Sequence, residues 1–319
     1  MIIFTIIHYL MDILLHQKAA NYADKEVNGL TEPKWIKESK YASSLTYKKL
    51  SQIPAKKFAR KIIKKYELES SEQQQQLISY QKQCNTYSKH ISKYLEAAFK
   101  VIVFGSVYLY GLGLIYYDGK WFWDQKWMWA QGEFQDPGTN KYFNLDIYYY
   151  LQIGYHGHRA IYQFFEHSRR DFWAMFIHHW VTVALLMGSK MVGKQQIGAT
   201  VLLCNDNVDL LMPLAKLCQY NQYKTLEMIF TISFCILWIP LRLGVYFYKV
   251  IYSVLIDGYS ELRPYWTHWL SLLGLTVIYS LQWFWTRYLL EMVWKKLFAG
   301  KGIVDVRSDD EGDDNKKRK

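Results

Sequence analysis

The sequence predicts an all-α polytopic membrane protein with about seven transmembrane helices, six of them forming a bundle or barrel around a central cavity. Two observations carry this prediction. Aromatic residues are abundant, with 27 Tyr, 16 Phe and 13 Trp. Hydropathy is also segregated along the chain, because residues 16–96 and 299–319 are polar and charged whereas most of 97–298 is apolar. Such segregation favours a membrane protein over a soluble globule.

The apolar stretches define the expected spans. Ile2–Leu15 is short for a span, which needs about 20 residues, and we interpret it as an uncleaved N-terminal anchor. Pro240 lacks a backbone N–H and is expected to kink the sixth span. The clear spans are Ala97–Tyr117, Tyr142–Phe165, Trp173–Lys190, Gln195–Leu217, Leu226–Ile256 and Tyr265–Phe298.

These spans divide the chain into a membrane anchor (1–15), a basic cytosolic segment (16–96), a membrane domain (97–298) and an acidic then basic cytosolic tail (299–319). The segment 16–96 carries sixteen Lys or Arg. Positive loops stay in the cytosol, so the N-terminus is expected to be lumenal and the C-terminus cytosolic. For Ser51–Tyr66 the sequence favours two interpretations equally: a basic helix on the membrane surface, or part of a solvated linker.

The net charge of +11 does not point to nucleic acid, because the basic residues flank apolar spans as the positive-inside rule expects. None of the four cysteines forms a C-x-x-C pair. Neither a zinc site nor a disulfide framework is therefore indicated.

Four ionisable residues lie inside two consecutive predicted spans. His178 and His179 occupy one, and Asp206 and Asp209 occupy the next. Such residues cost about 2.5–3.5 kcal/mol each at the bilayer centre on insertion scales, which indicates a buried polar site. At the helical rise, His178 and Asp209 lie roughly 9 and 10 Å inside the same cytosolic face. The aspartates share one helix face, whereas the histidines are about 100° apart on theirs.

At these residues the chain resembles the ceramide synthases of the TRAM–LAG1–CLN8 (TLC) family. The resemblance covers about residues 95–298 and nothing is carried over to the first 90. The order and spacing of the R-x-D, HH and D-x-x-D elements make the match specific. It consists of Arg169-Arg170-Asp171, Met175, His178-His179 and Thr182, continuing through Asn205-Asp206 and Asp209 in the segment NDNVDLLMPLAK.

The resemblance makes 97–298 a TLC catalytic domain and implies N-acylation of a long-chain sphingoid base by acyl-CoA. It also implies an endoplasmic reticulum membrane location, membrane lipids as partners, a possible homo- or hetero-dimer, and no bound cofactor or metal. Lys316 and Lys317 match the dilysine retrieval pattern of that compartment. The implied catalytic residues are His178, His179, Asp206 and Asp209, and the implied substrate-binding residues are Arg169, Arg170, Asp171, Thr182 and Asn205.

Amide formation from a thioester can use histidine in two ways. The imidazole can act as a general base, or it can attack the thioester and form an acyl-imidazole that the amine cleaves. The resemblance favours the second route, with His178 as the nucleophile in preference to His179. Asp209 or Asp206 would orient the imidazole or relay a proton. Arg169 and Arg170 are positive-inside anchors first and candidate ligands of the CoA phosphates second.

Some assignments stay open. His156 and His158 either line the approach to the site or lie at the membrane interface. A di-iron desaturase would need several histidine boxes, whereas His8, His16, His90 and His268 are scattered among the nine histidines. A non-catalytic TLC-family protein that binds lipids or assists translocation is the main alternative.

Overall fold

The computed structural model describes residues 1–27, 32–33, 71–129, 144–165, 170–262 and 265–299. Within these ranges the chain is helical and contains no strand, which confirms the predicted all-α class. The predicted surface helix Ser51–Tyr66, Arg169 and the C-terminal tail with Lys316 and Lys317 lie outside the described residues.

The chain divides into two compact units. Met1–Ile7 and Phe99–Lys319 form the first, and His8–Ala98 forms the second. In the second unit, helix α1 (Ile2–Val27) packs on helix α5 (Ser71–Phe99). There the ring of Tyr22 lies 5.6 Å from that of His90 and 6.0 Å from that of Tyr94. All of the candidate site residues lie in the first unit.

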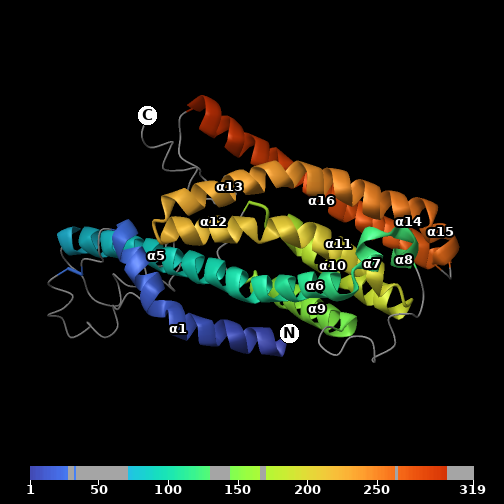
Figure 1. The fold of residues 1–319 in the computed structure, drawn as a ribbon. Helices are drawn as coiled ribbons and strands as arrows, with labels where there is room; N and C mark the ends of the chain where they lie inside the picture. Colours follow the sequence, from blue (N-terminus) through green and yellow to red (C-terminus); the bar gives the residue numbers. More distant parts are fainter. Residues whose placement is uncertain (28–31, 34–70, 130–143, 166–169, 263–264, 300–319) are drawn as a thin grey trace. The chain divides into compact units, whose positions relative to one another are not determined.

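The long helices of the first unit run side by side along a common direction (Figure 1). Four short helices gather at one end of them: α7 (Lys120–Trp123), α8 (Gln125–Trp129), α14 (Ser253–Ile256) and α15 (Gly258–Glu261). The longer helical segments are α6 (Gly105–Asp118), α9 (Leu145–Tyr162), α10 (Phe172–Met191), α11 (Gln195–Asp209), α12 (Leu211–Tyr220), α13 (Lys224–Trp238), η3 (Ile239–Tyr252) and α16 (Tyr265–Ala299). The five-residue π-helical segment η2 (Lys100–Phe104) leads directly into α6.

Local sequence signals set the helix boundaries next to the site. The Asn144 side chain caps α9 by accepting a hydrogen bond from the Asp146 amide at 2.7 Å. Gly193 has φ +70°, a left-handed conformation that glycine adopts at little cost. It lies in the tight turn that ends α10 and lets α11 return alongside it. This turn brings the two helices with the predicted histidines and aspartates together.

Three described helical stretches are long and apolar enough to cross a membrane: Gln75–Tyr117, Phe172–Met191 and Lys224–Ile256. They support a transmembrane protein. Helices α9 and α11 also fall in predicted spans, but α9 buries Gln152, His156 and Arg159, and α11 buries Asn205 and Asp206. These polar residues lower the mean hydropathy of both helices. The count of seven spans remains a prediction.

Pro240 does not end its helix. The chain passes from α13 directly into the π-helical segment η3, which begins at Ile239 with the proline in its first turn. Proline cannot donate the backbone hydrogen bond of a regular helix, and π-helical turns are often found at functional sites. Arg242 lies within this π-helical segment and is only 2% exposed.

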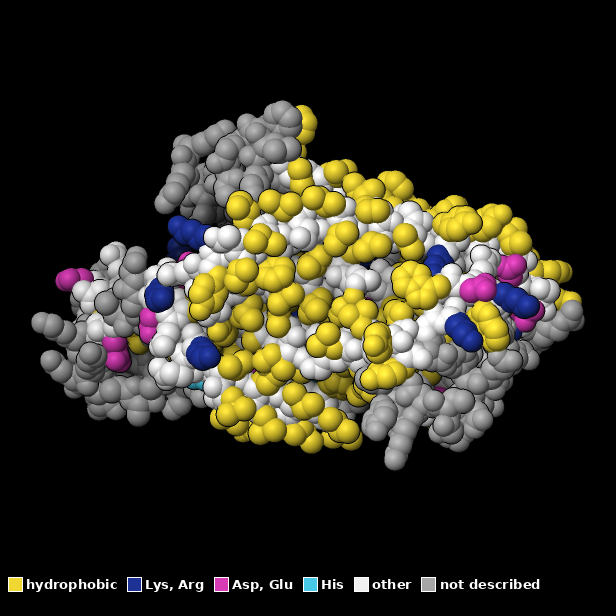
Figure 2. Space-filling model, viewed as in Figure 1, with side chains coloured by type: hydrophobic (Ala, Val, Ile, Leu, Met, Phe, Trp, Pro, Cys, Tyr) yellow, Lys and Arg dark blue, Asp and Glu magenta, His cyan; other side chains and the backbone are white. Residues whose placement is uncertain are grey.

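Hydrophobic side chains cover the middle of the face seen in Figure 2, and most charged side chains lie toward its ends. Large exposed apolar residues of the first unit include Leu226, Ile229 and Ile236 on α13 and Leu270 and Leu273 on α16. An apolar surface of this extent suits contact with lipid.

Candidate active site

The two adjacent histidines of α10 face different neighbours. His179 is 5% exposed, and its Nδ1 atom lies 3.1 Å from Nδ1 of His156 on α9. The ring of His178 instead meets the edge of Trp285 on α16, with centroids 5.5 Å apart. The angle of about 100° between successive helical residues explains this division. Both rings lie near His156, but only the ring of His178 also contacts α16.

The two aspartates of α11 also have different partners. Asp206 is 2% exposed and accepts hydrogen bonds from Gln152 Nε2 at 2.7 Å and Tyr148 Oη at 3.3 Å, both on α9. Asp209 forms an ion pair with Arg242 on η3. Both Asp209 and Arg242 lie within electrostatic reach of His178. Asp209 is thus the carboxylate associated with His178, whereas Asp206 holds α11 to α9.

Arg242 is a buried cation that the sequence analysis did not single out. Besides pairing with Asp209, it donates from Nη2 to the Asn205 carbonyl at 3.1 Å. Its guanidinium carbon lies 4.8 Å from the ring centroid of Trp238. A buried charge requires such partners because desolvation is costly. A lone arginine inside the apolar stretch Leu226–Ile256 was the available signal.

Asn205 connects three elements. Its Oδ1 atom accepts from Gln282 Nε2 on α16 at 2.9 Å, and its Nδ2 atom donates to the Val201 carbonyl at 2.8 Å. Its own carbonyl binds Arg242. The side chain is 8% exposed. In this structure Asn205, expected to bind substrate, organises the contacts among α11, α16 and η3.

The remaining described residues of the predicted motif lie at the start of α10 and one turn after His178. Arg170 is exposed, two residues before this helix begins. Asp171 is 2% exposed and accepts from Trp285 Nε1 at 3.1 Å, so Trp285 contacts both Asp171 and the His178 ring. Thr182 lies one turn after His178 and donates from Oγ1 to the His178 carbonyl at 2.7 Å.

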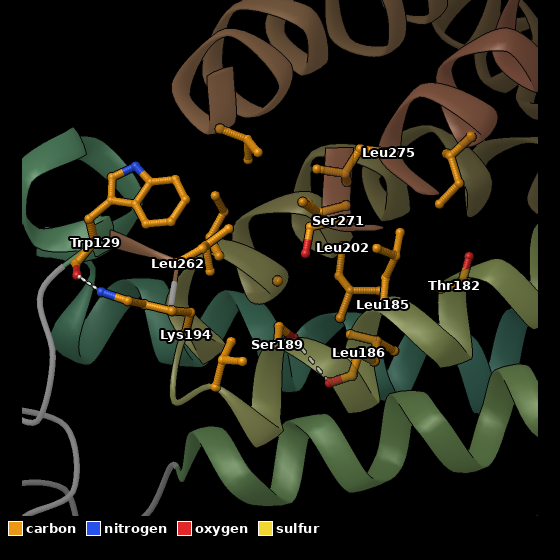
Figure 3. Close-up of a pocket in the computed structure, with 16 residues that line it drawn as sticks. Trp129, Thr182, Leu185, Leu186, Ser189, Lys194, Leu202, Leu262, Ser271 and Leu275 are labelled. Atoms are coloured by element: carbon orange, nitrogen blue, oxygen red, sulfur yellow. Dashed lines mark hydrogen bonds between the residues drawn. The ribbon is translucent and has the colours of Figure 1, made fainter. Parts of the chain in front are cut away.

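An apolar pocket extends from Thr182 along α10 (Figure 3). Between Thr182 and Val192 the helix rises roughly 15 Å. At the far end Lys194, which is 1% exposed, donates to the Trp129 carbonyl at 2.7 Å and pairs with Glu261 at 2.8 Å. The other lining residues are Leu185, Leu186, Ser189, Ile197, Gly198, Val201, Leu202, Val254, Leu262, Ser271, Leu275 and Ile278.

The structure places His156 and His158, two residues apart on α9, in different surroundings. His156 joins His178 and His179, and ring nitrogens of the three lie within 4.8 Å of one another. His158 instead contacts Thr5 through Nδ1 at 3.3 Å and packs against the ring of Phe99. Residues two apart on a helix point in nearly opposite directions, which accounts for the difference.

Comparison with known proteins identifies the family to which the chain belongs. The TLC domain family matches residues 93–291. The chain belongs to this family. The resemblance inferred from the histidine and aspartate motif is therefore confirmed at the level of the family.

Individual relatives are distant in sequence. Human ceramide synthase 5 is 28% identical over 162 residues, covering 51% of this chain and 41% of that protein. Ceramide synthase hyl-2 of Caenorhabditis elegans is 28% identical over 174 residues, covering 51% and 52%. Alternaria stem canker resistance protein 1 of Solanum lycopersicum is 29% identical over 241 residues, covering 72% and 77%. The chain thus spans about half the length of the ceramide synthases it matches.

Proposed function

We propose that this TLC-domain protein is a ceramide synthase, an enzyme that transfers a fatty acyl group from acyl-CoA to the amine of a long-chain sphingoid base. One observation carries the proposal. The imidazole of His178 lies within electrostatic reach of the Asp209–Arg242 ion pair, and an apolar pocket begins one helical turn away at Thr182. This combines a nucleophile or base with a space suited to a hydrocarbon chain.

The substrates would enter from different environments. The acyl chain would occupy the pocket between α10, α11 and α16, and the polar CoA group would remain in cytosolic water near Arg170. This arrangement requires the proposed orientation, with seven spans, a lumenal N-terminus and a cytosolic C-terminus in the endoplasmic reticulum membrane. It also assigns acyl transfer to the membrane domain, residues 97–298. Residues 1–15 would then be the anchor, 16–96 the basic segment and 299–319 the tail.

The proposed reaction has two steps. A neutral His178 nitrogen attacks the thioester carbonyl, the carbon–sulfur bond breaks, and CoA leaves as the thiolate. The sphingoid amine then attacks the acyl-imidazolium, the carbon–nitrogen bond to His178 breaks, and the released imidazole takes the proton that the amine loses, which returns through water to the CoA thiolate. Among the described residues, His178 Nδ1 has no hydrogen-bond partner, which suits a lone pair available for attack. Asp209, held by Arg242, would orient the ring and stabilise positive charge on it.

A product analysis tests this function. Full-length protein purified in detergent is given one long-chain base and a panel of acyl-CoAs, and the lipids are identified by mass spectrometry. We expect an N-acylated base from the wild-type protein and none from His178→Ala. His16→Ala, which alters a histidine of the other unit, is the matched control and should retain activity. Binding of these lipids by folded wild-type protein without any product would support the non-catalytic, lipid-binding alternative.

A further inference from the structure

Three imidazoles from α9 and α10 converge on one point of the first unit. Ligand nitrogens of His156, His178 and His179 all lie within 4.8 Å of one another. The ring centroids of His156 and His179 are 5.4 Å apart, and those of His156 and His178 are 6.1 Å apart. One imidazole would suffice as the proposed nucleophile, so the convergence of three calls for an explanation of its own.

The cluster has unused hydrogen-bonding capacity in its buried nitrogens. His156 is 6% exposed, and its Nε2 atom has no hydrogen-bond partner within the described part of the chain. The same holds for Nδ1 of His178. Buried polar atoms are normally paired, so a buried atom without a partner points to a bound ligand or a functional role. Nδ1 of His178 is thus an unpaired atom available to an ion, whereas His156 would bind the ion through Nδ1, the atom that faces His179.

The spacing of the nitrogens suits a transition-metal ion. Zinc–nitrogen bonds of 2.0–2.1 Å in a tetrahedral site place two ligand nitrogens about 3.4 Å apart. The Nδ1 atoms of His156 and His179 are 3.1 Å apart. A ligand nitrogen of His178 lies within 4.8 Å of both, and we expect its side chain to rotate toward a bound ion.

Charge and ligand type select the class of ion. Neutral imidazole suits Zn²⁺, Co²⁺ and Cu²⁺, whereas Mg²⁺ and Ca²⁺ require oxygen ligands. Asp209 lies within electrostatic reach of His156 and His178 and favours a cation there, whereas Arg159, Lys100 and Arg242 oppose it. Because three cations oppose a bound ion and one carboxylate favours it, we expect binding to be reversible.

We propose that His156, His178 and His179 bind a divalent first-row transition-metal ion of the Zn²⁺ class, and that the bound ion inhibits the enzyme. Coordination would occupy the lone pair with which His178 attacks the thioester. The site is therefore regulatory, and turnover does not depend on the ion. Metal binding stands independently of the proposed function, whereas the inhibition rests on it.

Binding is tested without substrates. Full-length, chelator-treated protein in detergent is titrated with Co²⁺ while the visible absorption of its d–d bands is recorded, and Mg²⁺ is the negative-control ion. We expect one Co²⁺ per chain with the spectrum of a four- or five-coordinate site, displaced by Zn²⁺ and unaffected by Mg²⁺. Absence of this spectrum in folded wild-type protein overturns the proposal.

Substitutions of single histidines test which side chains bind the ion. His156→Phe and His179→Phe keep a ring but remove a ligand, and each should weaken Co²⁺ binding at least about tenfold, since even outer-shell losses cost 10–100-fold. His16→Phe, outside the cluster, should bind as the wild type does. Each variant is first checked by size-exclusion chromatography, and His156→Gln replaces His156→Phe if that variant does not elute normally. Unchanged Co²⁺ affinity in a folded His156 variant overturns the site.

The inhibitory role has a separate readout. Zn²⁺ should inhibit acyl transfer by the wild-type protein, and preincubation with acyl-CoA should reduce Co²⁺ binding because His178 is then acylated. Co²⁺ binding with activity insensitive to Zn²⁺ would overturn the regulatory part. A protein that binds Co²⁺ but forms no N-acylated product would overturn the proposed function and leave the metal site standing.

Discussion

Arg242 forms an ion pair with Asp209 and thereby connects the π-helical segment η3 to the end of α11. The arginine is 2% exposed, whereas the Asp209 side chain is 43% exposed. Breaking such a pair leaves one charge without its partner, and the penalty falls on the more deeply buried group. The pair therefore supports the local fold, and we propose that its carboxylate also orients His178, which lies within its electrostatic reach.

The first prediction separates these two roles. Asp209→Asn should lower the free energy of unfolding by about 1–3 kcal/mol, because Arg242 stays buried without its counter-ion. The double variant Asp209→Asn/Arg242→Met should recover part of that loss. Both should remain poor in turnover, since neither supplies the carboxylate near His178. The measurements are thermal unfolding in detergent and initial rates; full activity of the double variant would exclude a role for Asp209 in the reaction.

The second prediction concerns Asp206. Gln152→Leu removes its shortest described hydrogen bond, of 2.7 Å, at a position that is fully buried. Loss of a buried hydrogen bond costs about 1–3 kcal/mol, so the unfolding temperature should fall. Tyr150→Phe, on the same helix but 61% exposed, is the matched control and should change little. Equal stability of the two variants would show that the Asp206 network does not hold α9 to α11.

The third prediction tests the pocket. Ser271 on α16 lines it, so Ser271→Phe should fill part of the space available to an acyl chain. The variant should use long acyl-CoAs less well while keeping its rate with short ones. Ser280→Phe places the same ring at an exposed position of the same helix. An unchanged chain-length profile of products from Ser271→Phe would mean that the acyl chain binds elsewhere.

The helical class could be predicted from the sequence. So could the fact that the helix with the two histidines lies next to the helix with the two aspartates. Ionisable residues inside apolar stretches are conspicuous, and a short turn between two such stretches makes them antiparallel neighbours. Depth along a helix follows from residue counting. For this reason His178 and Asp209 could be predicted at matching depth from the chain alone.

The rotational settings of the helices could not be read in the same way. Asp206 and Asp209 share one face of α11, yet one binds α9 and the other η3. Arg242 faces inward within π-helical turns, where the regular 100° step no longer applies. The place of His156 likewise depends on how α9 packs against α10. These contacts are set by tertiary packing rather than by periodicity.

The most direct test of the central claim is the intact mass of the protein after incubation with acyl-CoA alone. The two-step account predicts release of CoA and addition of one acyl group to the wild-type chain, no adduct on His178→Ala, and loss of the adduct when the sphingoid base is added. Wild-type protein that forms N-acylated product yet never carries an adduct would contradict the acyl-histidine route, leaving His178 as a general base.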